Sequence, residues 1–299
     1  TIEQTSTWTV NNLYAERYTA GRVFCMGDAV HRHPPTNGLG SNTSIQDAYN
    51  LCWKLALVVR GHASPALLDS YDAERQPVGQ QIVTRANKSI EDFPPIFEAV
   101  GLLSSDDPEL AKAFIAARKA PTPEGKARRR ALHRAIAQKS YEFNCHGVEL
   151  NQRYRSRAVV EDGTPEPAWE RDRELYYQAT TWPGARVPHV WLERGGRRVS
   201  TIDVVGDGKF VVLTGIGGEG WRAAAARVAA ATGVAIDVVS IGPAGCDAQD
   251  IYGDWYTACE VEEDGCVLVR PDMHVAWRAA AMVADPARAL GDVFARILG

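Results

Sequence analysis

The sequence predicts an α/β (α+β) protein in two parts, a mostly helical first part followed by a small α/β domain. Between residues 44 and 143, apolar side chains recur at helical spacing in segments separated by glycine and proline. Beyond residue 187, short apolar runs typical of strands alternate with an alanine-rich helical segment. Residues 161–170 have the composition of a turn-rich linker, so we place the domains at residues 1–160 and 161–299.

The first part opens with an extended stretch over residues 7–26. Its last residues, 22–26, form an apolar run that stops just before Asp28, which predicts a buried strand with an acidic side chain at its carboxyl end. A helix is expected to start near Ser44, because Ser44 and Asp47 have the spacing of a capping box.

This helix is expected to close at Gly61, and a second one to begin at Ser64 with a proline at its first helical position. Proline lacks an N–H and fits poorly inside a helix, so Pro77 is expected to break or kink the second helix. Two or three further helical segments are expected between residues 94 and 143, divided at residues 106–108 and 121–123.

Beyond the linker the pattern changes to short strands. In chain order we expect strands at residues 187–192 and 198–205 around Gly195 and Gly196, a strand at 209–214, a helix at 220–232, a strand at 235–241, a hairpin of 259–261 with 266–270 turning at 263–265, and a final helix capped by Asp285 with Pro286 at its first position. A β-α-β-β-α order after a leading hairpin is typical of a thioredoxin-like domain.

Composition and charge exclude several classes of partner. The 299 residues are 45% hydrophobic, enough for a sizeable core in each domain, and the formal net charge of -4 disfavours nucleic acid and anionic membrane surfaces. No apolar run approaches the roughly 20 residues that span a bilayer. The six cysteines are scattered, with no C-x-x-C pair and no signal peptide, so we expect reduced thiols in a cytoplasmic protein whose partner is a small molecule.

The residues most informative about chemistry lie between positions 27 and 42. Asp28, at the end of the predicted strand, is placed to accept hydrogen bonds from a chain of sugar-like hydroxyls. The loop over residues 34–42 brings Gly38 and Gly40 to the start of the predicted helix, where backbone N–H groups and the helix dipole favour a negative charge. The simpler interpretation, that Asp28 caps a turn and the glycines only shape a loop, does not explain why all these features occur in this order.

Residues 21–43 resemble the second flavin-binding segment of the FAD-dependent aromatic hydroxylases, in the branch that hydroxylates phenols and chlorophenols. The similarity continues through residues 47–55, 71–77 and 267–278, and so extends over nearly the whole chain. The resemblance implies that FAD is the cofactor, that NADPH reduces it, and that O₂ is used to hydroxylate a small phenolic substrate at the ortho position. Relatives of this kind suggest a homodimer.

The resemblance also implies where the flavin lies. Asp28 would bind the ribityl and phosphate region, and Pro35 would wall the ring near its oxygen-reacting carbon. The backbone positions expected against the isoalloxazine ring are Gly38, Leu39, Gly40 and Asn42. The resemblance assigns no catalytic side chain in this chain.

The family opens with a Rossmann strand-turn-helix that carries G-x-G-x-x-G, and the residues before Gly27 leave no room for it. We therefore expect the C-terminal portion of such an enzyme, without the front half that completes the flavin and substrate sites, and inactive on its own. The alternative is a non-catalytic assembly or dimerisation protein, built on the thioredoxin-like domain, in which the flavin segment is a relic.

A second glycine-rich segment offers a competing nucleotide site. Residues 215–220 fit G-x-G-x-x-G between a predicted strand and a predicted helix, with Asp237 about 20 residues further on. The acid should end the second strand, whereas the apolar residues 238–241 follow Asp237, so we give this interpretation little weight. The same turn has no C-x-x-C, which argues against disulfide exchange.

Other polar groupings predict neither a metal nor a nucleic-acid site. His31 and His33 lack a nearby cysteine or acid to complete a ligand set, and the aspartates between residues 247 and 254 miss the spacing of a calcium loop. Basic residues between positions 126 and 134 form a short patch on a predicted helix, which we interpret as a solvated face.

Overall fold

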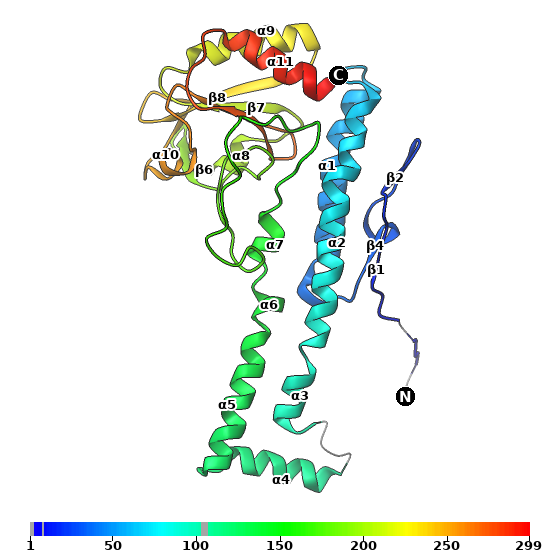
Figure 1. Ribbon diagram of the computed structural model, residues 1–299. Coiled ribbons are helices and arrows are strands. Elements are labelled where there is room, and N and C mark those ends of the chain that lie inside the picture. Colours follow the sequence, from blue (N-terminus) through cyan, green and yellow to red (C-terminus); the bar gives the residue numbers. More distant parts are fainter. Residues whose placement is uncertain (1–2, 8, 103–106) are drawn as a thin grey trace.

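The structure is a computed structural model that describes residues 3–7, 9–102 and 107–299. Two long helices, α1 (Gly40–Val59) and α2 (Asp69–Glu91), form a central column, with small N-terminal ribbons on one side and a sheet domain on the other (Figure 1). Further helices extend the column away from the sheet domain (Figure 1). No helix in the described ranges has both the length and the apolar character needed to cross a membrane.

The N-terminal segment forms two short antiparallel ribbons. β1 (Leu13–Tyr14) pairs with β4 (His31–Arg32), and β2 (Thr19–Ala20) pairs with β3 (Val23–Phe24). The prediction of a buried strand at residues 22–26 is therefore wrong, since Val23 is 61% exposed. An apolar run becomes a buried strand only when other strands and a covering layer surround it, and here β3 has β2 alone as its described neighbour. Residue 8, within the predicted extended stretch, lies outside the described residues.

Helix α1 begins at Gly40, four residues before the predicted start, and no side chain caps it. The predicted capping box is wrong because both of its side chains bond elsewhere. The Ser44 hydroxyl donates to the Gly40 carbonyl at 2.9 Å, and the Asp47 carboxylate is completely buried among other partners. The end agrees with prediction, because α1 stops at Val59 and Gly61 follows with a φ of 74°.

The second helix starts as predicted and then runs longer than predicted. The Ser64 hydroxyl accepts the Ala66 N–H at the start of the short 3₁₀ helix η3 (Pro65–Leu68), and α2 follows directly. Pro77 does not break α2, which continues for 23 residues. Packing against α1 and η3 outweighs the one backbone hydrogen bond that a proline forfeits.

The helical arm beyond α2 is divided into separate segments as predicted, but its described residues form four helices between positions 94 and 143 instead of two or three. It comprises α3 (Pro94–Val100), α4 (Pro108–Lys119), α5 (Pro123–Gln138), α6 (Ser140–Phe143) and α7 (His146–Leu150). Thr122 caps α5 by accepting the Gly125 N–H at 3.1 Å, and Asp107 caps α4 in the same way. Residue 106, in the first predicted divider, lies outside the described residues.

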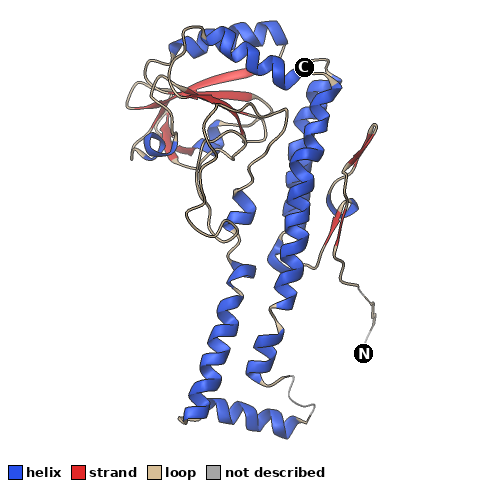
Figure 2. Cartoon of the chain, viewed as in Figure 1, coloured by secondary structure: helices blue, strands red, loops and turns tan. Residues whose placement is uncertain are grey.

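The C-terminal domain is one mixed sheet with strand order β11-β10-β7-β8-β9-β5-β6. Its strands are β5 (Trp191–Arg194), β6 (Arg197–Ser200), β7 (Phe210–Thr214), β8 (Ile236–Gly242), β9 (Ala248–Gln249), β10 (Cys266–Val269) and β11 (Val275–Ala279). Its helices are α8 (Thr201–Val204), α9 (Glu219–Thr232), α10 (Asp254–Ala258) and α11 (Pro286–Leu298). Helices α9 and α11 lie side by side over one face of the sheet (Figure 2).

The core under α9 and α11 extends beyond the sheet domain. Trp53 of α1 meets Phe210 of β7 edge to face, with ring centroids 5.6 Å apart, and Phe210 in turn contacts Phe294 of α11. The Ser64 amide also donates to the Leu298 carbonyl at 2.7 Å, which ties the end of α11 to the turn before α2. The column and the sheet domain therefore share one hydrophobic core. Residues 151–190 form no helix and no strand longer than a bridge, and the domain boundary near residue 161 stays a prediction.

Three predicted strands of this domain need correction. The strand expected at 187–192 begins only at Trp191, and the one expected at 198–205 ends at Ser200, where a capping box with Asp203 starts α8 instead. The predicted hairpin of 259–261 with 266–270 is wrong, because β10 pairs with β11 and β7. The turn that follows β10 includes Met273 at a φ of 65°. This left-handed conformation is uncommon for methionine, so the sequence does not indicate the turn.

Candidate functional site

Asp28, the acidic residue of the predicted flavin segment, has a carboxylate that is accessible to a ligand. Asp28 lies in the short 3₁₀ helix η1 (Gly27–Ala29), exposed, and its carboxylate has no hydrogen bond or ion pair with the described residues. Its main-chain carbonyl accepts Arg32 Nε at 2.9 Å, which fixes the local backbone. Asp28 therefore presents an unsatisfied anionic acceptor on a constrained turn.

The loop that follows is held from behind by the helices. The Thr36 hydroxyl donates to the Ala86 carbonyl of α2 at 2.6 Å, and Asn37 Nδ2 donates to the Tyr141 carbonyl of α6 at 3.1 Å. Asn37 and Gly38 both adopt left-handed backbone conformations, with φ of 67° and 62°. A Cβ atom at Gly38 would meet nothing within 4 Å, so the outer side of this turn is open to a flat ligand.

The loop ends at the start of α1. The first N–H groups of a helix have no intrahelical acceptors, and the dipole of this 20-residue helix adds positive potential there. Asn42 Nδ2 donates to the Gly38 carbonyl at 2.8 Å, so the side chain of Asn42 braces the turn. The Leu39 side chain points into the core formed with Val78 and Ile82, leaving its backbone as the group that faces the loop.

Most of the predicted residues of this segment are accessible at the surface, whereas the Leu39 side chain is buried. Pro35, Gly38 and Asn42 are exposed, and Gly40 is half-buried. The helix η1 that carries Asp28 packs against the first turns of α1. The contact is close, because a Cβ atom at Gly27 would lie only 2.8 Å from Ser44 Oγ. An exposed acid, an open glycine turn and a helix N-terminus fit one edge of a flavin.

Sequence reasoning missed the group that supports this surface. Asp47 Oδ2 accepts the Gly27 N–H at 3.1 Å and bonds His31 Nε2 at 2.9 Å, while Asp47 Oδ1 accepts Arg75 Nε at 2.7 Å. Burial alone would raise the pKa of Asp47, but the hydrogen bond from His31 and the charge of Arg75 outweigh it and hold that pKa below its usual range. One signal was available in the sequence, since Asp47 shares its helix face with Leu51.

A second buried cluster joins the column to the sheet domain. Glu74 of α2 accepts Arg270 Nη1 at 2.6 Å and Lys54 Nζ at 2.8 Å, and Arg270 also pairs with Asp272 at 2.5 Å. All four side chains are at most 2% exposed. Burial lowers the pKa of Lys54 to about 8, against the opposing charge of Glu74. Two cations and two carboxylates therefore balance inside the protein.

The two clusters are connected through aromatic side chains. Arg75 Nη1 donates to the Tyr154 hydroxyl at 2.8 Å, and the Tyr154 ring stacks on His274 with centroids 4.3 Å apart. His274 Nδ1 bonds the main-chain carbonyl of Asp272 at 2.9 Å. The flavin segment and the turn between β10 and β11 are thus linked by continuous buried contacts.

The competing sites have ordinary structural roles. Asp237 is the second residue of β8 and pairs with Lys209 at 2.9 Å, so it does not stand at the carboxyl end of that strand. His31 is taken by Asp47, and His33 Nδ1 bonds the Pro34 carbonyl at 2.7 Å. Across the described ranges, no group of three or more His, Cys, Asp or Glu side chains is arranged to hold a metal ion.

Two families of known proteins match parts of this chain. Residues 1–86 match the family described as FAD binding domain, and residues 180–299 match the family described as aromatic-ring hydroxylase, C-terminal. The 2,4-dichlorophenol 6-monooxygenase of Delftia acidovorans is 56% identical over 278 residues, which are 93% of this chain and 47% of that protein. The 2,4-dichlorophenol 6-monooxygenase of Cupriavidus pinatubonensis is 54% identical over 300 residues, which are 100% of this chain and 50% of that protein.

Phenol 2-monooxygenase of a Pseudomonas species is 50% identical over 96% of this chain and 47% of its own length. Among solved structures, the flavin-dependent monooxygenase PieE in complex with FAD and substrate superposes with a TM-score of 0.92 at 54% identity, covering 100% of this chain and 51% of that one. The fold is therefore that of the flavin-dependent monooxygenases. Within that class, the chain belongs to the FAD-dependent aromatic-ring hydroxylases. It spans about half the length of the curated relatives it matches.

Proposed function

We propose that this chain supplies one wall of the flavin site, together with the C-terminal domain, of an FAD- and NADPH-dependent enzyme that hydroxylates phenols. The observation that carries the proposal is the surface formed by Asp28, the open turn at Gly38 and the N-terminus of α1. When bound, FAD would supply the redox chemistry, which uses NADPH and O₂ to place one oxygen atom on the ring.

The residues of this chain would bind and orient the cofactor. The Asp28 carboxylate is suited to accept hydrogen bonds from ribityl hydroxyls, because it has no other hydrogen-bond partner among the described residues. The Gly38 turn leaves room for a ring to approach the backbone. The free N–H groups at the start of α1 would stabilise negative charge on the ring. Pro35, exposed on the same loop, would shield one part of it from water.

The substrate class follows from the names of the relatives. Three of the curated relatives are named as monooxygenases of phenol or of 2,4-dichlorophenol, at 50–56% identity. We propose phenols with small ring substituents, chlorine included, as substrates, with the new hydroxyl entering beside the existing one.

We also propose that residues 161–299 form a thioredoxin-like domain. Parallel β7 and β8 joined by α9, with β10 antiparallel to β7 and β11 beyond it, support this description. A redox role for the domain has no support. Burial raises the pKa of all three thiols in this range, Cys246, Cys259 and Cys266, which disfavours the reactive thiolate.

A chimaera tests the activity. In it, this chain replaces the matched half of the 2,4-dichlorophenol 6-monooxygenase of Cupriavidus pinatubonensis, with which it is 54% identical. We expect NADPH oxidation that 2,4-dichlorophenol or phenol stimulates and that yields a catechol. The alternative, an assembly protein with a relic flavin segment, requires a folded chimaera that phenols do not stimulate, and that result would reject our proposal.

The 299-residue chain alone is proposed to be inactive, because its residues form one wall of the flavin site. Flavin absorbance after mixing with FAD and desalting tests this. A stoichiometric amount of retained FAD together with phenol-stimulated NADPH oxidation would refute the proposed inactivity and leave the family function intact.

A further inference from the structure

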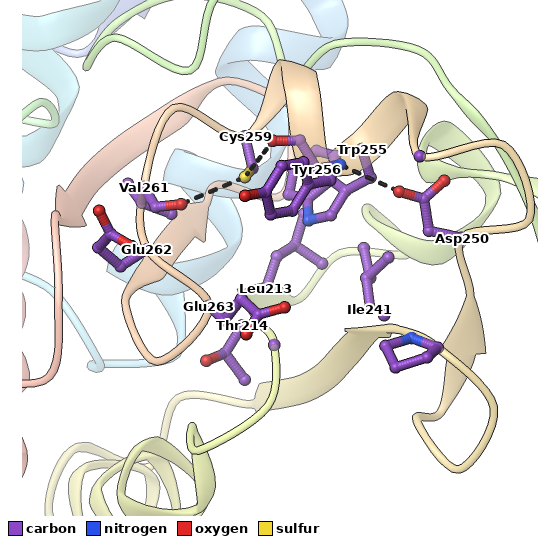
Figure 3. A pocket seen from close by; sticks show the side chains of 14 residues that line it. Leu213, Thr214, Ile241, Asp250, Trp255, Tyr256, Cys259, Val261, Glu262 and Glu263 are labelled. Atoms are coloured by element: carbon purple, nitrogen blue, oxygen red, sulfur yellow. Dashed lines mark hydrogen bonds between the residues drawn. The ribbon is translucent and has the colours of Figure 1, made fainter.

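A cavity of about 200 Å³ lies in the sheet domain, at the carboxyl ends of the parallel strands β7 and β8. Leu213 and Ile241 form its floor, and Trp255 of α10 forms one wall (Figure 3). In sheets with parallel strands, ligands bind preferentially at this edge. None of the residues proposed to contact flavin lines the cavity, so the cavity is distinct from the proposed flavin site.

The wall of the cavity is preformed. Both oxygens of the Asp250 carboxylate are engaged, one with the Asp254 N–H at 3.1 Å and the other with the Tyr256 N–H at 3.0 Å, which fixes the start of α10. Trp255 is 5% exposed and cannot swing out, whereas the Tyr256 side chain is 74% exposed at the mouth. Opposite, the Gly215 N–H donates to the Glu263 carbonyl at 2.8 Å and holds that segment against the end of β7.

The lining carries negative charge without a counter-ion. It includes the carboxylates of Asp250, Glu262 and Glu263 and no lysine, arginine or histidine. The Glu262 and Glu263 side chains form no hydrogen bond or ion pair with any described residue. Of the two arginines of the adjacent helix α9, Arg222 is already paired with Asp247.

We propose that this cavity binds a small organic cation, namely a primary or secondary amine attached to an aromatic ring or a short aliphatic body. The volume suits one ring, since a cavity of about 150 Å³ accommodates benzene. The apolar floor would bury the ring, while the Tyr256 and Trp255 rings and the two free carboxylates attract a positive charge.

The same features exclude other occupants. A nucleotide at the glycine turn of residues 215–220 would bring its phosphates beside Glu263, whose backbone is bonded to Gly215. A phenolate, the class of substrate proposed above, carries the same sign of charge as the lining and is disfavoured as well. The cavity is therefore a cation site that does not depend on the flavin proposal.

Calorimetric titration of the 299-residue chain with three one-ring probes of similar size tests the inference. Benzylamine is expected to bind at least about 10-fold more tightly than benzyl alcohol, and benzoate more weakly than either. Raising the salt concentration should weaken benzylamine binding, because the rim carboxylates are solvent-exposed. Equal affinity for the three probes, or no binding of benzylamine, would overturn the proposal.

Variants locate the binding. The double variant Glu262→Gln and Glu263→Gln should weaken benzylamine binding at least about 5-fold and leave benzyl alcohol unchanged. Tyr256→Ala should weaken the binding of benzylamine more than that of the alcohol. Asp292→Asn, at an exposed position of α11, is the matched control and should change nothing. All of these side chains are on the surface, so folding should persist, as thermal unfolding will verify. A double variant that binds benzylamine like the wild type would place the ligand elsewhere and reject the assignment.

Discussion

The carboxylate of Asp47 lies 3.1 Å from the amide nitrogen of Gly27, so a buried side chain of α1 holds the backbone that carries Asp28. The same carboxylate bonds His31 and Arg75, and it is completely buried. A turn that binds a ligand needs a rigid backbone, and the buried Asp47 carboxylate would give that rigidity to the turn at Asp28. Several consequences of this arrangement can be measured.

Replacing Asp47 by Asn should destabilise the protein by about 3 kcal/mol, because it leaves the Arg75 guanidinium buried without its charged partner. The amide of Gly27 should also exchange its hydrogen faster, since its acceptor is weakened. Chemical denaturation and hydrogen exchange measure the two effects. Asp28→Asn is the matched control: its carboxylate is exposed and unbonded, so the free energy of unfolding should not change. An equal loss in both variants would contradict the supporting role of Asp47.

The contribution of Asp47 should depend on pH. Its pKa is lower in the folded protein than the ordinary value of 3.8, so the unfolded state takes up the proton first as the pH falls. The stabilisation is therefore fully present above about pH 5 and is lost as the pH falls through the folded pKa. The gap in unfolding free energy between wild type and Asp47→Asn should be constant from about pH 6 to 8 and should narrow below about pH 4. A difference in unfolding free energy that grows as the pH falls would show that the pKa of Asp47 is raised in the folded protein, and would contradict the prediction.

Replacing Arg270 should lower the stability of the chain and uncouple the unfolding of the helices from that of the sheet domain. Its guanidinium joins Glu74 of α2 to the sheet domain, and its loss leaves two carboxylates with one buried cation. Arg270→Met is expected to cost about 3–5 kcal/mol, and denaturation of the variant should resolve two transitions where the wild type has one. The matched control is Arg222→Met, whose ion pair with Asp247 is partly exposed and should be worth less than about 1 kcal/mol. Similar costs for the two variants would contradict the proposed coupling.

The turn at Gly27 should not tolerate a side chain. Gly27→Ala combines a left-handed backbone, at a φ of 60°, with a contact of 2.8 Å to Ser44 Oγ. Gly21→Ala has a similar φ of 58° and open space, so it should show the backbone cost alone, about 1–2 kcal/mol. The excess cost of Gly27→Ala should shrink when Ser44 is changed to Ala in the same chain. If Gly27→Ala costs no more than Gly21→Ala in urea denaturation, the close packing of η1 on α1 is not as described.

Elements with strong local signals were predictable from the sequence. Ser64 and Asp285 mark helix starts by their side chains, and the strand expected at residues 209–214 is present as β7. The turn before α1 was predictable too, because its glycine and prolines act through the local backbone, although α1 starts at Gly40 instead of Ser44; its contact with a flavin stays a prediction. The errors arose where distant residues decide the outcome. The apolar run at residues 22–26 lies at the surface. Asp47 does not cap α1 but forms an ion pair with Arg75 of α2.

Charged residues show the same limit most clearly. Arg270 and Glu74 are 196 positions apart in the chain, and neither carries any local sign that the other will neutralise it. Asp272 and Asn50 meet across 222 positions. Sequence periodicity reports which face of an element is apolar, but it does not report which buried charges will be paired. The turn before α1 was therefore predictable, whereas the buried charges that hold it were not.

The amount of FAD bound by the chimaera with 2,4-dichlorophenol 6-monooxygenase tests the central claim, that residues 27–42 form a wall of a flavin site. The chimaera with the wild-type chain should purify with one FAD per protein. Asp28→Ala should bind FAD about 10- to 100-fold more weakly, because a hydrogen bond to a charged acceptor is worth about 1.5–3 kcal/mol. The control Glu91→Ala, an exposed acid at the end of α2, should bind FAD like the wild type. A folded chimaera without FAD, or an Asp28→Ala variant that binds FAD as tightly as the wild type, would contradict the claim.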